Sequence, residues 1–199
     1  MEIIIPKDIT PKEFFEEFLP KEHRKLDSSL MLQLNFIIGA EILGKNGGDW
    51  SIEYDNGEIE VLRGTPDEPL FTISLDIEEW QRAIDNNLTS IFFSGSDLDK
   101  NMLKLLNQNK VNRLKNEHGT INIVIDSLEF EGEVFDFKFS ILIGEPLDGD
   151  PSLTINVSQD VFNKIRENHQ NLYKLISSNA LNTSGDFRYL MKLATIVFF

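Results

Sequence analysis

Two segments of the sequence have part of the pattern of an ion-binding or phosphate-binding loop. Residues 39–45, GAEILGK, have the spacing of a P-loop, but Asn46 stands where the magnesium-binding Ser or Thr is required. A phosphate cradle also needs amides that converge at a helix N-terminus, whereas these glycines lead into a predicted strand. Asp148-Gly149-Asp150 lacks the remaining ligands of an EF-hand loop. We therefore expect no nucleotide site at residues 39–45, and we interpret Asp148-Gly149-Asp150 as a polar turn.

Other residues capable of catalysis or metal binding do not form a recognisable group either. His23, His118 and His169 stand in polar stretches at no ligand spacing, and the chain has no cysteine. No GxSxG or other nucleophile motif occurs. Glu78 and Glu79 fall in a predicted first helical turn, where a carboxylate complements the helix dipole. We therefore expect no enzyme activity, no cofactor and no metal site.

The composition restricts the partners and the location of the protein. The 199 residues carry a formal net charge of −14, so a polyanion such as nucleic acid would be repelled. No apolar run reaches the length of about 18 residues that would indicate a membrane span, and the N-terminal MEIIIP has no basic region of a signal peptide. Together with the absence of cysteine, these features predict a cytoplasmic protein. Phe supplies 15 aromatic residues, which is typical of a dry core or a lined cavity.

One segment of the sequence occurs twice. Residues 63–84, RGTPDEPLFTISLDIEEWQRAI, are similar to residues 143–165, IGEPLDGDPSLTINVSQDVFNKI. In the alignment of the two segments, Trp80 meets Phe162. Because self-similarity at a fixed distance indicates a repeated structural unit, the sequence predicts an internal repeat.

Each copy of this segment predicts a strand followed directly by a helix. The runs 71–75 and 153–157 alternate between apolar and polar residues, as in a strand with one buried face. Asp76 and Ser158 are then suitable N-caps, and Glu79 completes the spacing of a capping box in the first copy. Trp80 occupies the fourth helical position, from which it is predicted to pack on the preceding strand in the core.

The first half contains further predicted elements. Thr10-Pro11-Lys12-Glu13 predicts a capped helix that ends at Pro20. Strands are predicted at 30–38, 50–54 and 58–62, and Asn56-Gly57 predicts a type I′ turn between the last two. Residues 100–116 have a helical pattern with five basic and no acidic side chains. We interpret this stretch as a connecting helix, and a docking face for an acidic partner is the alternative.

The second half continues with predicted strands at 120–128 and 134–143. Ser184 is the expected N-cap of a C-terminal helix. The apolar stripe of that helix consists of Phe187, Leu190, Met191, Ala194 and Val197. Because such a stripe must be covered, we expect the helix to lie on a sheet, a cavity or a partner.

An ordered series of short patterns resembles the sterol carrier protein 2 family. In the first half the series is FLP (18–20), LQLNF, GGDW, DNG, VLRG, LFTISLD, EEW and FFSGS, and in the second half it is PSLTINVS and LISSNALNTSGDFRYLMKLATIV. The resemblance implies two degenerate copies in tandem, residues 1–105 and 106–199, with a boundary within 98–117. It implies an α+β fold of mainly antiparallel sheets with helices packed on one face. Each copy lacks strands of the family, so we expect the copies to complete one another; a single fused domain is the alternative.

The same resemblance implies a function. We expect a non-enzymatic carrier of an apolar ligand such as a fatty acid, an acyl chain or a sterol-like lipid, with the C-terminal helix as a lid. The residues expected to contact this ligand are Trp80, Phe92, Phe93, Phe187, Leu190, Met191, Ala194 and Val197. The alternative is an interaction or assembly module with a closed cavity, whose C-terminal helix docks on a partner or forms a homodimer.

Overall fold

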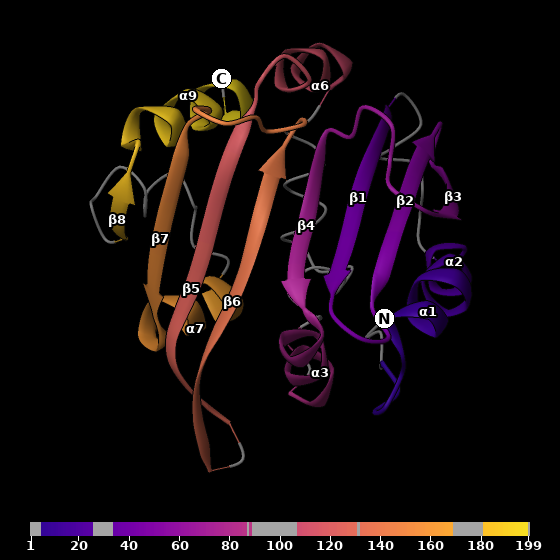
Figure 1. The fold of residues 1–199 in the computed structure, drawn as a ribbon, viewed down its shortest axis with the longest axis vertical. Coiled ribbons are helices and arrows are strands. Elements are labelled where there is room, and N and C mark those ends of the chain that lie inside the picture. Colours follow the sequence, from indigo (N-terminus) through magenta and orange to yellow (C-terminus); the bar gives the residue numbers. More distant parts are fainter. Residues whose placement is uncertain are drawn as a thin grey trace.

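An eight-stranded sheet passes through both halves of the chain (Figure 1). The computed structural model describes residues 5–25, 34–86, 88, 107–130, 132–168 and 181–198. In sheet order the strands are β3 (Glu58–Arg63), β2 (Gly48–Asp55), β1 (Asn35–Leu43), β4 (Phe71–Asp76), β6 (Glu133–Ile143), β5 (Gly119–Phe130), β7 (Ser152–Ser158) and β8 (Asn182–Gly185). The sheet is mixed but mainly antiparallel, and the fold is α+β, as predicted.

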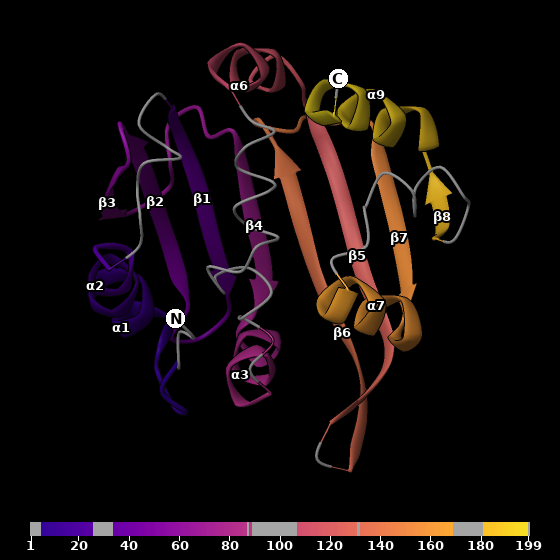
Figure 2. The ribbon, with the colours of Figure 1, turned by 180° about the vertical axis from the view of Figure 1, so that it is seen from behind.

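Helices cover one face of this sheet (Figure 2). They are α1 (Pro11–Glu13), the π-helix η1 (Phe14–Phe18), α2 (Leu19–His23), α3 (Ile77–Asp85), α6 (Gln108–Leu114), α7 (Gln159–Asn168) and α9 (Phe187–Phe198). Figure 2 shows α7 and α9 on the same face of β5 and β7, near opposite ends of these strands. The part of the sheet that lies between these two helices is therefore covered by a helix at each end.

The two halves have a related strand arrangement. In each half an antiparallel pair, β1–β2 or β5–β6, is followed by a strand parallel to its first member, β4 or β7, and then by a helix. The halves meet where β4 pairs antiparallel with β6. Each half thereby gains a neighbouring strand from the other half. The description of the halves as tandem copies of one family module stays an interpretation.

The turn between β2 and β3 has the predicted geometry. Asn56 and Gly57 have φ of 50° and 87°, which is the left-handed conformation that a type I′ turn requires at both central positions. The strand register follows directly from this turn, since Asp55 is opposite Glu58. The long β5–β6 pair instead has a register shift between Ile125 and Leu128, where Ser127 has a φ of 53°. Such a bulge increases the local twist of the pair.

The N-terminal helical segment begins as predicted but does not end at Pro20. Thr10 and Glu13 form the capping box, with the Glu13 amide 3.2 Å from the Thr10 hydroxyl and the Thr10 amide 3.0 Å from the Glu13 carboxylate. Pro20 is the second residue of α2, and the amide of Leu19 donates to the carbonyl of Phe14 in a π-turn. The wider π-turn relieves the clash that a proline ring causes in an α-helix. The expected stop at Pro20 was therefore wrong.

The capping box expected at the start of α3 is absent. Asp76 is the N-cap residue, but its side chain makes no capping hydrogen bond. Glu79 is buried and turned toward β6, where it accepts from the amide of Lys138 at 3.4 Å and pairs with Arg82 at 2.8 Å. This tertiary contact replaces the local one that the spacing predicted.

Of the N-caps predicted for α7 and α9, the first is confirmed and the second is wrong. Ser158 accepts from the amide of Val161 at 3.4 Å, which confirms it as the cap of α7. Ser184 lies in β8 and is not the cap of α9. Asp186 takes that place, because its carboxylate accepts from the amide of Arg188 at 3.0 Å.

The buried apolar residues form two clusters. One cluster, here called the aromatic cluster, lies between the N-terminal helices and the first strands and contains Phe14, Phe15, Trp50 and Trp80. The ring of Phe15 stacks on Trp50 at 4.8 Å and tilts against Trp80 at 5.5 Å. The other cluster, the main core, includes residues from both halves of the sheet and from α6, α7 and α9.

Candidate functional site

The side of the central strands that faces the helices is apolar. In one transverse row Ile73 of β4 is opposite Ile141 of β6, which is opposite Ile121 of β5, and Ile121 is opposite Leu153 of β7. In the next row Phe139 is opposite Ile123, which is opposite Ile155. We call these residues the apolar floor: Ile73, Ile121, Ile123, Phe139, Ile141, Leu153 and Ile155. The period-two alternation of the strands places all of them on one face.

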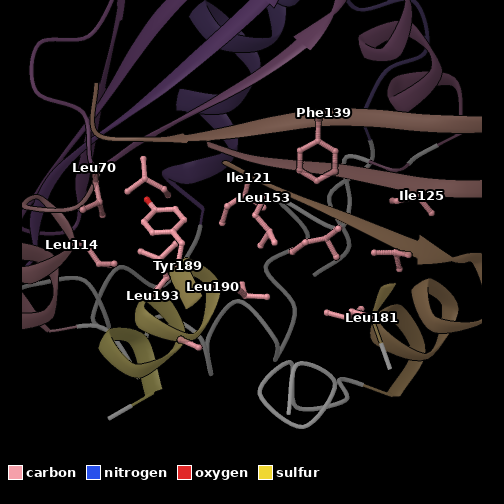
Figure 3. Close-up of a cluster of buried hydrophobic side chains, with 14 of the residues drawn as sticks. Leu70, Leu114, Ile121, Ile125, Phe139, Leu153, Leu181, Tyr189, Leu190 and Leu193 are labelled. Carbon is pink, nitrogen blue, oxygen red and sulfur yellow. The ribbon is translucent and has the colours of Figure 1, made fainter. Parts of the chain in front are cut away.

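The apolar floor is not uniformly buried. Ile121, Phe139, Leu153 and Ile155 are buried in the main core, and Figure 3 shows the first three of them below the strands that carry them. Ile73, Ile123 and Ile141 pack against the same core but are only partly buried. Partly exposed isoleucines in the middle of a sheet leave apolar area that a ligand could remove from water.

Helix α9 lies over one end of the apolar floor and joins the main core. Leu190 and Ala194 are buried in this core, as predicted, and Met191 and Val197 pack against it. Phe187, in contrast, is 36% exposed. The predicted stripe therefore applies to four of its five residues.

Three buried residues of α9 were missing from the predicted stripe. Tyr189, Leu193 and Ile196 are about as buried as Leu190. Figure 3 shows Tyr189 and Leu193 beside Leu190 on α9. Their i, i+4, i+7 spacing is itself a helical signal, which could have identified a broader buried face. The predicted face was counted from Phe187, which is exposed. It was therefore rotated about the helix axis away from the face that is buried.

The structure does not bring Trp80 together with the residues of α9. Trp80 is 3% exposed, as predicted for a core residue, but it belongs to the aromatic cluster. Its ring meets Phe14 edge-on at 5.0 Å, and its indole N–H donates to the carbonyl of Ile9 at 3.4 Å. Phe92 and Phe93 lie outside the described residues.

Helix α6 holds the C-terminal end of α9. Val111 and Leu114 of α6 are buried in the main core. The ammonium group of Lys110 donates to the carbonyl of Val197 at 2.8 Å, close to the end of α9. A cation at this position also complements the negative end of the helix dipole. This contact gives a function to one basic residue of the stretch 100–116, of which residues 100–106 lie outside the described part.

A cluster of polar side chains lies beside the N-terminal half of α9. The Lys192 ammonium is 2.6 Å from the carboxylate of Glu117, which is 8% exposed. With Tyr189, His118, Asp150 and Arg188 these residues line a hollow of about 340 Å³. The tyrosine pKa is raised well above its ordinary value by burial and, to a smaller extent, by the negative charges of Glu117 and Asp150.

A smaller hollow of about 200 Å³ lies over the opposite face of the sheet, between the connections that precede β4 and follow β6. Its lining includes Glu41, Pro66, Thr72, Leu142 and Pro146. Among the described residues no group of His, Asp and Glu side chains could hold a metal ion. In the same part of the chain no helix is long and apolar enough to span a membrane.

The comparisons with known proteins agree with the resemblance seen in the sequence for one half of the chain. None of the curated proteins matches the chain. Residues 100–198 match the model of the SCP-2 sterol transfer family. This range contains α6, β5 to β8, α7 and α9, and therefore all of the apolar floor except Ile73. The half of the chain that carries the floor and its covering helix is thus similar to the SCP-2 sterol transfer family.

Proposed function

We propose that the protein is a non-enzymatic binding protein for an apolar lipid, which lies between α9 and the apolar floor. The observation that carries this proposal is that Ile73, Ile123 and Ile141 are only partly buried in the middle of the sheet. The other four residues of the apolar floor, which surround them, are buried. A ligand that covers about 100 Å² of this apolar surface gains roughly 2.5 kcal/mol from desolvation of the protein side alone.

The chemistry of the floor supports binding rather than catalysis. Its seven side chains are Ile, Leu and Phe and offer no nucleophile, acid or base. Lipid sites are apolar cavities with few polar groups that fix orientation. The similarity of residues 100–198 to a sterol transfer family supports the same class of ligand.

Helix α9 is suited to act as a movable cover. Its contacts with the sheet are made by apolar side chains of the main core, including Leu190, Leu193 and Ile196. Apolar contacts are not directional, so a lipid beneath the helix can replace the apolar contacts that the helix gives up when it shifts. The Lys110 contact with Val197 would serve as the hinge end of such a motion.

Native mass spectrometry of the purified protein, followed by organic extraction, tests this proposal. We expect a lipid of one apolar class to co-purify, or, after delipidation, saturable uptake of Nile red with one site per chain. Absence of both a bound lipid and probe uptake contradicts the proposal. If that protein is also a stable dimer, the assembly function of α9 replaces the carrier function.

A further inference from the structure

Tyr189 occupies an unusual position at the end of the apolar floor. It is 4% exposed, and its ring lies so close to Gly119 that a Cβ at that position would come within 2.8 Å of two ring atoms. Gly119 is opposite Ile143 of β6, in the row of the sheet next to Ile141. The glycine therefore provides the space that lets a tyrosine ring lie against the sheet at the edge of the floor.

The Tyr189 hydroxyl has no hydrogen-bond partner among the described residues. In Figure 3 the ring rises from α9 and its oxygen is directed away from Leu190 and Leu193, toward the side of Leu70. A buried hydroxyl without a partner costs about 1–3 kcal/mol, and a phenylalanine would avoid this cost. The hydroxyl is thus a buried donor and acceptor without a partner, between the main core and the polar hollow that Tyr189 also lines.

The charges next to Tyr189 restrict what it can bind. Three carboxylates line the adjoining hollow, those of Glu117, Asp150 and Asp186, together with His118, Arg188 and Lys192. The positive charge of Lys192 is paired with the carboxylate of Glu117, and the Arg188 side chain is exposed to solvent. The described residues that line the hollow therefore include no unpaired buried cation that could bind an anion. Glu117 and Asp150 act on the tyrosine as negative charges, and with burial they raise its pKa. The hydroxyl therefore stays protonated at neutral pH, and an anionic ligand group beside it is disfavoured.

We propose that Tyr189 is a specificity-determining residue, whose hydroxyl binds an uncharged polar end of the lipid, a hydroxyl or carbonyl group, while the apolar part of the lipid lies on the floor. This inference rests on the proposed function and makes it more specific: it predicts a neutral alcohol or ester and not a fatty acid anion. The ligand would supply the partner that the hydroxyl lacks.

Displacement of Nile red by 1-dodecanol, dodecanoate and dodecane, which share one chain length, tests the inference. We expect wild-type protein to bind dodecanol about tenfold more tightly than dodecanoate at pH 7. Tyr189→Phe should weaken dodecanol binding about fivefold, the factor for one hydrogen bond of about 1 kcal/mol, and should leave dodecane binding unchanged. The melting temperature of ligand-free Tyr189→Phe should equal or exceed that of the wild type.

Tyr54→Phe is the matched control, because Tyr54 lies on β2 and stacks on Phe36 far from α9 in the sheet order. It should bind all three compounds as the wild type does. Equal dodecanol affinity of Tyr189→Phe and wild type, or a wild-type preference for dodecanoate, overturns the polar subsite while the proposed lipid binding stands. If the wild type takes up neither Nile red nor dodecane, the proposed function fails, and this inference fails with it.

Discussion

Ile73 of β4 lies directly opposite Ile141 of β6, and this pair belongs to the ladder that joins the first half of the sheet to the second. The main core likewise contains Phe36 and Leu70 of the first half together with Phe139 and Leu190 of the second half. Backbone pairing and apolar burial therefore cross the predicted boundary at 98–117. Because the two halves share a strand pairing and a hydrophobic core, they are expected to unfold together.

We predict that the protein unfolds in one cooperative transition. Both tryptophans, Trp50 and Trp80, lie in the aromatic cluster of the first half, so their fluorescence reports that half. Far-ultraviolet circular dichroism reports the whole chain. The urea midpoints measured by these two probes should coincide within error. Separate midpoints would show that the halves are independent domains, as the tandem interpretation expects.

Trp80→Ala should destabilise the protein by roughly 3–5 kcal/mol, the usual cost of deleting a buried aromatic side chain. The ring is almost completely buried between Phe14 and Phe15, and the N-terminal helices would lose their contact with α3. Trp80→Phe keeps a ring but loses the hydrogen bond to Ile9, and should cost roughly 1–2 kcal/mol. Urea unfolding followed by circular dichroism gives both values. Equal stability of the alanine variant and the wild type would contradict the assignment of Trp80 to a core.

The local part of the fold could be predicted from the sequence, because it is determined by neighbouring residues. Period-two alternation gave β4 and β7 almost residue by residue, and Asn56-Gly57 gave the type I′ turn. The Thr10 capping box was also visible as a four-residue pattern. In each case the deciding contacts lie within a few positions in the chain.

The features that were not predicted depend on residues far apart in the sequence. Glu79 leaves the expected cap because the amide of Lys138, 59 residues later, is its partner. Tyr189 is buried because Gly119 leaves room for its ring. The pairing of β4 with β6 could not be specified, since the alternation of each strand sets its buried face and not its neighbour. The candidate site depends on that pairing, and for this reason sequence patterns gave its covering helix but not its floor.

The two N-caps of the first half provide a direct comparison of capping energies. Thr10→Ala should cost about 1 kcal/mol, since the Thr10 hydroxyl accepts from the amide of Glu13. Asp76→Ala should cost no more than about 0.5 kcal/mol, because Asp76 contributes only its charge at the start of α3. The free energies of unfolding from urea titrations test this order. The opposite order would mean that the Asp76 side chain caps α3 in solution.

Glu13 should give the capping box a dependence on pH. Hydrogen bonds from the Thr10 backbone and side chain hold the pKa of the Glu13 carboxyl below its ordinary value of 4.5. Since the folded-state pKa is lowered, the stabilisation is present above pH 4.5 and is lost as the pH falls through the folded-state pKa. The melting temperatures of wild type and Glu13→Gln should therefore differ at pH 7 and approach each other as the pH falls below 4.5 through the folded-state pKa. A difference that persists unchanged to pH 3 would show that the carboxylate charge is not responsible.

Met191→Glu should abolish lipid uptake while leaving a cooperatively folded protein. Met191 packs against the main core from a partly buried position, so a carboxylate there can reach water in the empty protein. In the complex the same carboxylate would be buried against an apolar ligand, which is strongly unfavourable without a partner. Nile red uptake and the cooperativity of thermal unfolding, measured on the same sample, separate the two effects.

Thr195→Glu is the control for this substitution, because it introduces the same charge one helical turn later at an exposed position. The Thr195 hydroxyl donates to the carbonyl of Met191 at 2.8 Å, so the change also removes one local hydrogen bond of α9. We expect Thr195→Glu to take up Nile red as the wild type does. If both variants lose uptake equally, general destabilisation of α9 explains the loss and the Met191 side chain does not face the ligand. If Met191→Glu takes up the probe normally, the ligand does not lie beneath this face of α9, and the proposed position of the lipid is wrong.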